Sequence, residues 1–349
     1  MNDGASAWRK TAAKSALWGV VAAAAWGAAS FSVERTLEEV VGARETSAEA
    51  SVEADDWGTA SSPAESLLRR SIVRLEGLRS LSADLEFEGR FFGERYLGRG
   101  RYEETSEGTG GSGARRSTLD NVRYRLWAAI SRGNAKGASD EHEDNSQEIV
   151  CDCDRQALWK YTAMEGGKSL TRIDVEELSS GLANFSVEEL KAIGVEGPCA
   201  ANGLPGLGGL PGTLRRLSTV YRFEPRIEKA PDFMGTEVVK ITGRARETFW
   251  KTSKERLGVD RFEPYLNENL PGNVEIYFGV DWPFPYKIVY FSLAEDEERT
   301  RNDIFTLEYS TVVRNDATIR PEDFNYHQPQ TTFERVTSKY VESLIAKPE

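Results

Sequence analysis

The hydrophobic positions of this chain repeat first with the period of an α-helix and then with that of β-strands. Over residues 63–78 the apolar side chains recur at spacings of three and four, which places them on one face of a helix. Ser62 is expected to cap this helix at its N-terminus, with Pro63 at the first helical position. The apolar face consists of Leu67, Leu68, Ile72, Leu75 and Leu78.

From Leu81 onward the period changes to two, and apolar side chains alternate with polar and charged ones as far as Phe91. This alternation predicts a half-buried strand. The strand that follows carries Gly98 and Gly100 on one face, where glycine lets a sheet curve sharply or lets another element approach closely. Further strands are predicted over residues 122–127, 147–153, 156–163, 168–175 and 234–247.

The stretch 272–326 contains three more strand-like runs, each followed by a turn. Around Ile288 both faces of the run are apolar, so we expect both faces to be covered. The runs predict an antiparallel meander, and the earlier strands are expected to extend it into one continuous sheet. The aromatic, proline-rich corner at 281–285 is interpreted as a structural edge of that sheet.

Two segments interrupt the strand pattern with helical spacing. Residues 176–222 are predicted to form a helical, glycine-rich insertion that covers the sheet, with a capping box at Ser186 and Glu189. Residues 330–349 are predicted to form a C-terminal helix. A polar insertion at 131–146 is expected to be a loop, and its acidic run at 141–144 is interpreted as solvated, because contiguous residues in a loop rarely fix a coordination geometry.

The N-terminus has the pattern of a membrane-targeting segment. Basic residues lie within 1–15, which is expected to remain cytoplasmic, and residues 16–33 carry no charge. This run has about 18 residues, the lower limit for a spanning helix. It is either a single transmembrane anchor or a signal that is cleaved after the small residues at 28–30. Residues 34–62 are expected to be a disordered acidic linker, which leaves 63–329 as the folded domain.

Composition and charge exclude several classes of function. The net charge of −12 argues against a nucleic-acid-binding protein, which needs a basic face to neutralise phosphates. Two histidines in 349 residues argue against histidine-based metal or triad chemistry. The glycine-rich segment around 202–212 is not followed by the Gly-Lys-Ser/Thr sequence of a P-loop. No catalytic, cofactor-binding or metal-ligating residue is therefore assigned.

The three cysteines are too few for a disulfide scaffold. Cys151 and Cys153 form a C-x-C pair, which without a second pair does not indicate a zinc site. In an exported chain, Cys199 could form a disulfide with either Cys151 or Cys153. Three unpaired thiols are the alternative.

Four features resemble the LolA/LolB-like superfamily of periplasmic lipoprotein carriers and related sensors. They are a helix before the first strand, a run of long antiparallel strands, the segment Val-Asp-Trp-Pro-Phe-Pro-Tyr-Lys-Ile at 280–288, and the closing segment that runs from Leu307 to Tyr326. The resemblance covers roughly residues 64–329. The chain differs from the family at the insertion 176–222, at the loop 131–146 and at the C-terminal helix.

The resemblance implies an α+β fold that is mainly antiparallel β: a strongly curved, unclosed, barrel-like sheet wrapped on helices. It also implies an apolar groove on the concave face, which binds acyl chains or a peptide of a partner protein. The aromatic side chains expected on that face could line such a groove, or they could simply fill the core against the helices. These candidate groove residues are Phe87, Phe91, Tyr124, Phe305 and Tyr309.

The expected function is therefore that of a non-enzymatic binding module in the cell envelope, outside the cytoplasm, for a lipid, an acyl chain or a lipoprotein. An envelope sensor domain of the same fold that recognises a protein partner is the alternative. Arginines on the first three strands are expected to pair with Asp84, Glu86 and Glu88 across strands, although a docking surface for an acidic partner would use the same residues. These arginines are Arg90, Arg95, Arg99, Arg101, Arg123 and Arg125.

Overall fold

The computed structural model describes residues 62–91, 94–106, 122–133, 146–152, 157–164, 167–186, 189–190, 208–249, 251, 271–293, 301–324 and 332–345. The predicted cytoplasmic terminus, the membrane segment 16–33 and nearly all of the linker lie outside these residues. Within the described ranges, no helix is long and apolar enough to cross a membrane.

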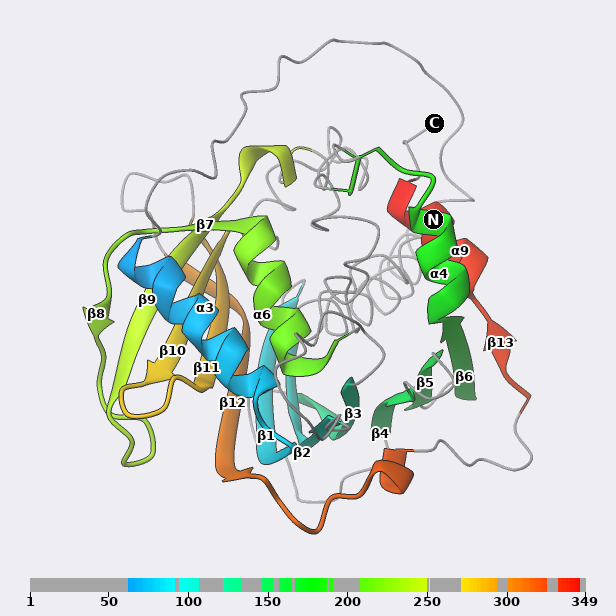
Figure 1. Ribbon diagram of the computed structural model, residues 1–349, viewed down its shortest axis with the longest axis horizontal. Helices are drawn as coiled ribbons and strands as arrows, with labels where there is room; N and C mark the ends of the chain where they lie inside the picture. Colours follow the sequence, from blue (N-terminus) through cyan, green and yellow to red (C-terminus); the bar gives the residue numbers. More distant parts are fainter. Residues whose placement is uncertain are drawn as a thin grey trace, which may run out of the picture.

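The strands of the described residues form one sheet, which Figure 1 shows curving around the helices. Its order is β13-β6-β5-β4-β3-β2-β1-β12-β11-β10-β9-β7, with β8 paired to β9 beside this path. The path ends at β13 and β7, so the sheet is unclosed, as predicted. The strands are β1 (Ser80–Phe91), β2 (Glu94–Ser106), β3 (Val122–Gly133), β4 (Ser146–Asp152), β5 (Ala157–Met164), β6 (Gly167–Asp174), β7 (Tyr221–Phe223), β8 (Glu228–Lys229), β9 (Val238–Ala245), β10 (Asn273–Gly279), β11 (Pro285–Leu293), β12 (Arg301–Arg314) and β13 (Glu334–Arg335).

The two halves of the sheet join where the first strand pairs with the last long one. β1 and β12 are antiparallel, with Leu81 opposite Arg314 and Gly89 opposite Phe305. Apart from the two-residue β13, which is parallel to β6, neighbouring strands are antiparallel. The prediction of one continuous, mainly antiparallel sheet is thus confirmed. The third strand was predicted too short, because β3 pairs with β2 as far as Gly133 and so takes up the start of the expected loop 131–146.

The helix before the sheet has the cap that its sequence predicts. Helix α3 (Pro63–Glu76) begins with Pro63, and the Ser62 hydroxyl accepts a hydrogen bond from the Glu65 N–H at 3.2 Å. The Glu65 carboxylate in turn accepts one from the Ser62 N–H at 3.1 Å, which completes a capping box. The apolar stripe is buried against the sheet and α6, with Leu68 and Leu75 almost fully buried.

The remaining helices form two groups at different places on the sheet (Figure 1). Helix α6 (Gly209–Val220) packs against α3, whereas α4 (Val175–Leu182) packs against α9 (Thr337–Ile345) beside β6. Two of the described helices in the region of the predicted insertion 176–222, α4 and α6, therefore lie apart, and the predicted C-terminal helix is the partner of α4. Sequence periodicity does not reveal this separation, because it shows which face of a helix is apolar but not what that face contacts.

On the convex face, the arginines of β1 and β2 pair with carboxylates as expected. Glu88 accepts hydrogen bonds from Arg90 and Arg95, at 2.9 and 2.8 Å. Arg99 lies 3.2 Å from Glu86. Arg101 forms ion pairs with Asp84 and Glu103, and Arg125 on β3 lies over the ring of Phe324 at 5.7 Å. Phe324 ends a short 3-10 helix, η4 (Pro321–Phe324). The side chain of Arg123 lies outside the described set.

Candidate ligand-binding face

Four of the five candidate groove residues lie in the main core on the concave face of the sheet. Phe87 comes from β1, Tyr124 from β3, and Phe305 and Tyr309 from β12. They are 6, 0, 0 and 2 % exposed, respectively. The fifth, Phe91, is the last residue of β1, and its side chain lies outside the described set. The structure therefore brings the described candidates to one face, where they are buried.

These aromatic rings form two groups. In the first, the Phe305 ring lies 5.7 Å from the Phe87 ring and 6.3 Å from the Tyr290 ring of β11, centroid to centroid. Phe87 also covers Gly98 of β2, where an added Cβ would lie 2.0 Å from the Phe87 ring. Close approach is one of the two roles that the sequence predicted for this glycine.

The second group is centred on Tyr102 of β2, which was not among the candidates. Its ring lies 6.2 Å from that of Tyr124 and 6.0 Å from that of Tyr309. Phe284, from the proline-rich corner, adds an edge-on contact of 5.7 Å with Tyr309. Phe284 is fully buried, and Trp282 stacks on it at 4.9 Å. The corner therefore contributes to the core, in agreement with its interpretation as a structural edge.

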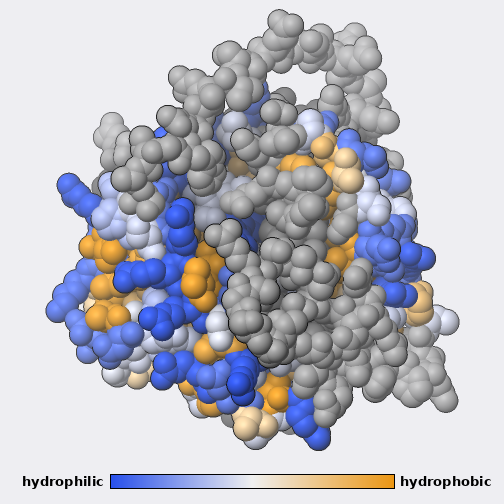
Figure 2. All heavy atoms as spheres, viewed as in Figure 1, coloured by the Kyte–Doolittle hydropathy of each residue, from blue (hydrophilic) through white to orange (hydrophobic). Residues whose placement is uncertain are grey.

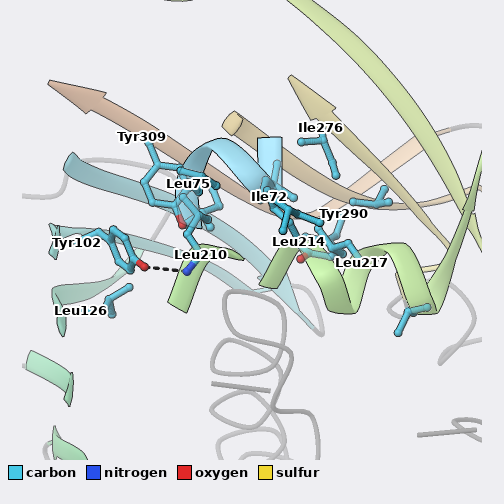
Figure 3. Close-up of a cluster of buried hydrophobic side chains, with 14 of the residues drawn as sticks. Ile72, Leu75, Tyr102, Leu126, Leu210, Leu214, Leu217, Ile276, Tyr290 and Tyr309 are labelled. Carbon is cyan, nitrogen blue, oxygen red and sulfur yellow. Dashed lines mark hydrogen bonds between the residues drawn. The ribbon is translucent and has the colours of Figure 1, made fainter. Parts of the chain in front are cut away.

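The N-terminus of α6 is joined to this second group by hydrogen bonds. The Leu210 N–H donates to the Tyr102 hydroxyl at 2.8 Å (Figure 3). It also donates to the Glu104 carboxylate at 3.2 Å, and Tyr102 donates its own hydroxyl proton to Glu104. Glu104 is only 5 % exposed. Gly208 and Gly209 adopt left-handed backbone conformations, with φ of 75° and 61°, and this lets the chain reach the sheet here.

Electrostatics explain the direction of these hydrogen bonds. Burial raises the pKa of Tyr102 well above its ordinary value, and the nearby Glu104 carboxylate raises it further. The phenol therefore stays protonated and acts as a donor to Glu104. The Glu104 side chain also lies at the N-terminus of α6, which is the positive end of the helix dipole. The glycines of the segment 202–212 were the sequence signal for this contact, but the spacing alone did not identify their partner.

Side chains of α3 and α6 form a layer over the concave face (Figure 3). Ile72 and Leu75 come from α3, and both are buried. Leu210, Leu214 and Leu217 come from α6 and are at most 4 % exposed. Together they cover the aromatic side chains of β2, β11 and β12. In this structure, therefore, α6 occupies the position where an apolar ligand was expected.

On the face seen in Figure 2, the coloured part of the surface is mainly hydrophilic, with smaller hydrophobic groups between the polar ones. Among the exposed large hydrophobic side chains are Met234, at 65 %, and Val280, at 47 %. Met234 lies at the tip of the turn between β8 and β9, and the Val280 N–H donates to the Glu237 carbonyl at 3.0 Å. The two residues therefore lie at the same end of the sheet.

The predicted cysteine chemistry falls largely outside the described residues. Cys151 is in β4, where its backbone pairs with Tyr124 on one side and Leu158 on the other. Cys153 and Cys199 are not described, so the disulfide stays a prediction. Among the described residues, no group of three or more His, Cys, Asp or Glu side chains is arranged to hold a metal ion.

No protein-family model matches the chain, and no curated protein matches it. Several solved structures are similar to it. The lipoprotein LppX of Mycobacterium tuberculosis shares 11 % identity at a TM-score of 0.33, over 72 % of this chain and 96 % of LppX. In the MucA/MucB complex of Pseudomonas aeruginosa, the match has 12 % identity and a TM-score of 0.34, over 76 % of this chain and 61 % of the other.

A third match is a domain from Vibrio parahaemolyticus described as an outer membrane lipoprotein-sorting protein. It shares 12 % identity at a TM-score of 0.28, over 75 % of this chain and 94 % of the domain. Because each TM-score is below 0.5, we base no functional argument on these matches. One of these similar structures is a lipoprotein-sorting domain, the kind of protein that the sequence resemblance named, and the likeness concerns the fold alone.

Proposed function

We propose that this chain is a non-enzymatic, extracytoplasmic binding module that holds the apolar part of a lipid, an acyl chain or a lipoprotein on the concave face of its sheet. The observation that carries this proposal is the aromatic face built by β1, β2, β3, β11 and β12 beneath α6. The helix reaches that face through Gly208 and Gly209, and its first described contact with the sheet is a set of hydrogen bonds around the Leu210 N–H.

In this proposal the ligand replaces α6 on the aromatic face. Exposing Leu210, Leu214 and Leu217 costs roughly 5–9 kcal/mol, if each side chain contributes about 1.5–3 kcal/mol when buried. An acyl chain that buries roughly six to eleven methylenes recovers this amount, at about 0.8 kcal/mol for each methylene. Short acyl chains should therefore fail to displace the helix, and long ones should succeed.

Displacement of a fluorescent polyene fatty acid from the purified full-length chain tests this proposal. We expect palmitate to compete and octanoate not to compete. Mass spectrometry of a solvent extract of the freshly purified protein should also detect a co-purified lipid. Absence of both the probe signal and any extracted lipid would mean that the concave face is only a core.

The alternative function is recognition of a protein partner. The exposed Met234 and Val280 at one end of the sheet favour it, because exposed apolar side chains are used at protein interfaces. Replacing both residues with serine should abolish capture of an envelope protein but leave fatty-acid binding unchanged. The reverse result would assign the partner contact to the concave face.

The proposed location in the cell envelope rests on residues 1–62. Fused to alkaline phosphatase, these residues should produce an active enzyme, since this reporter folds only outside the reducing cytoplasm. An active fusion in the membrane fraction indicates an anchor, and an active fusion in the soluble envelope fraction indicates a cleaved signal. An inactive fusion would exclude the envelope location.

A further inference from the structure

Lys160 is a cation on the concave face of the sheet. It lies in β5, two residues after Leu158, and residues two apart on a strand share a face. Leu158 belongs to the main core, as does Ile173 on the neighbouring β6. By contrast, Trp159 and Leu170 form a separate apolar cluster on the opposite face. The alternation thus places the Lys160 side chain on the same face as the candidate groove residues.

The register connects Lys160 to the centre of the aromatic face. Reading across the sheet from β2 to β6, the aligned positions are Tyr102, Leu126, Ile149, Lys160 and Thr171. The backbone distance between neighbouring strands is about 4.8 Å, so three steps separate Lys160 from Tyr102 along the wall. A ligand that contacts both residues must therefore span about 14 Å.

The charge of Lys160 has no partner among the described residues. Its ammonium group makes no hydrogen bond or ion pair with any residue in the part of the chain that the structure describes. Lys240 of β9, by comparison, lies 2.8 Å from Glu275 and 3.0 Å from Glu228. The arginines of β1 and β2 are paired in the same way on the convex face.

The surroundings of Lys160 disfavour its charge. The side chain is half-buried, and burial lowers its pKa to about 8. A cation without a partner charge on an apolar face makes the free energy of folding less favourable. Such costs are typical of binding sites, where the missing charge is supplied by a ligand.

We propose that Lys160 binds the head group of a lipid whose head is anionic, while the acyl chain of that lipid lies on the aromatic face. The proposal rests on the function proposed above and narrows it to anionic lipids. Complementary charge selects the ligand, because a carboxylate or phosphate gives the ammonium group the charge-assisted hydrogen bonds that none of the described residues gives it. A neutral lipid of equal chain length cannot do so.

Binding of oleate and oleyl alcohol to the full-length chain tests the proposal, since the two ligands share one chain and differ in head-group charge. We expect the native protein to bind oleate about tenfold or more tightly than the alcohol, as a charge-assisted hydrogen bond implies. Lys160→Gln should remove this preference by weakening oleate binding alone, and Lys160→Arg should retain it. Lys229→Gln is the matched control, because it removes an exposed cation of a surface hairpin.

The outcomes separate the two proposals. If oleate and the alcohol bind equally well and Lys160→Gln has no effect, the role of Lys160 is overturned and the binding function stands. If Lys229→Gln weakens oleate binding as much as Lys160→Gln does, the preference reflects net charge, and the assignment to Lys160 is again overturned. If the native protein binds neither ligand, the binding function itself fails.

Discussion

The backbone N–H of Leu210 donates a hydrogen bond to the hydroxyl of Tyr102 at 2.8 Å, although the two residues are 108 positions apart in the chain. This bond joins the first turn of α6 to the middle of the sheet. Both residues are buried, so an unmade hydrogen bond here would carry the full cost of desolvation. The position of α6 over the concave face therefore depends on a few polar atoms within an apolar layer.

Tyr102→Phe should loosen the start of α6. The variant removes an acceptor from the Leu210 N–H and a donor from Glu104, so we expect the free energy of unfolding to fall by about 1–3 kcal/mol. Hydrogen exchange at the Leu210 amide should become faster. Tyr277→Phe is the control, because it also removes a phenol that donates to a glutamate, Glu275, but on the convex face. Unchanged exchange at Leu210 in Tyr102→Phe would contradict the role given to this bond.

Gly209→Ala should destabilise the protein more than Gly235→Ala does. Both glycines have left-handed backbones, with φ of 61° and 80°, so alanine is strained at either position by about 1–2 kcal/mol. At Gly209 the new Cβ would also lie 2.7 Å from the Glu104 carboxylate oxygen, whereas nothing lies within 4 Å at Gly235. Urea denaturation of both variants measures the difference. Equal losses of unfolding free energy would show that the Glu104 side chain moves away from the new Cβ without lowering stability.

Glu275→Gln should destabilise the protein by about 3 kcal/mol at neutral pH, because it leaves a buried ion-pair network without its central charge. Glu275 is 3 % exposed and accepts hydrogen bonds from Lys240 at 2.8 Å and Arg301 at 2.9 Å. The control is Asp303→Asn, because Asp303 also binds Arg301 but is half-exposed, and its ion pair should contribute less than about 1 kcal/mol.

The same network predicts a dependence on pH. Burial alone would raise the pKa of Glu275, but the hydrogen bonds from Lys240 and Arg301 outweigh it, and the pKa falls below its ordinary value of 4.5. The native protein binds fewer protons here than the unfolded chain does, so this stabilisation is complete above pH 4.5 and is lost as the pH falls through the native pKa. The difference in unfolding free energy between the native protein and Glu275→Gln should therefore become smaller in acid. A constant gap in unfolding free energy between pH 7 and pH 3 would contradict this assignment.

Lys160→Met should make the free protein more stable at pH 7, by about 1 kcal/mol or more, since it removes a charge that burial disfavours. The pKa of Lys160 is about 8 in the folded protein and near 10.5 when unfolded. The buried charge therefore lowers the stability of the native protein by its full amount below pH 8. The penalty disappears as the pH rises towards 10.5. Its neighbours across the strands, Ile149 and Thr171, carry no charge that would alter this. Melting curves at pH 7 and pH 10 measure the change, and a destabilised variant at pH 7 would contradict the prediction.

The local elements of this protein could be predicted from its sequence because their signals are local. The capping box at Ser62 and Glu65 and the alternation that begins at Leu81 each lie within a few residues and depend on backbone geometry alone. The same is true of the carboxylates on β1, whose outward positions and basic neighbours on β2 follow from the period of two. The expected ion pairs of Glu86 and Glu88 were confirmed for this reason.

The candidate site could be predicted only in part. Alternation placed Phe87, Tyr124, Phe305 and Tyr309 on one face, but it did not identify Tyr102 and Glu104 as the contact point of α6. A glycine-rich segment predicts that a backbone approaches something closely, and it does not indicate what. Lys160 was likewise overlooked, because a lysine in an alternating strand is indistinguishable in sequence from one that faces water.

The sequence by itself determined the main helices and strands, and which face of each is apolar, because these properties follow from periods of 3.6 and 2 within short segments. Only the tertiary structure decided that β1 pairs with β12, that α6 lies on Tyr102, and that Lys160 faces the core with no partner charge among the described residues. These contacts join residues far apart in the chain, and the packing of the whole sheet selects them among many pairings with equally good local patterns.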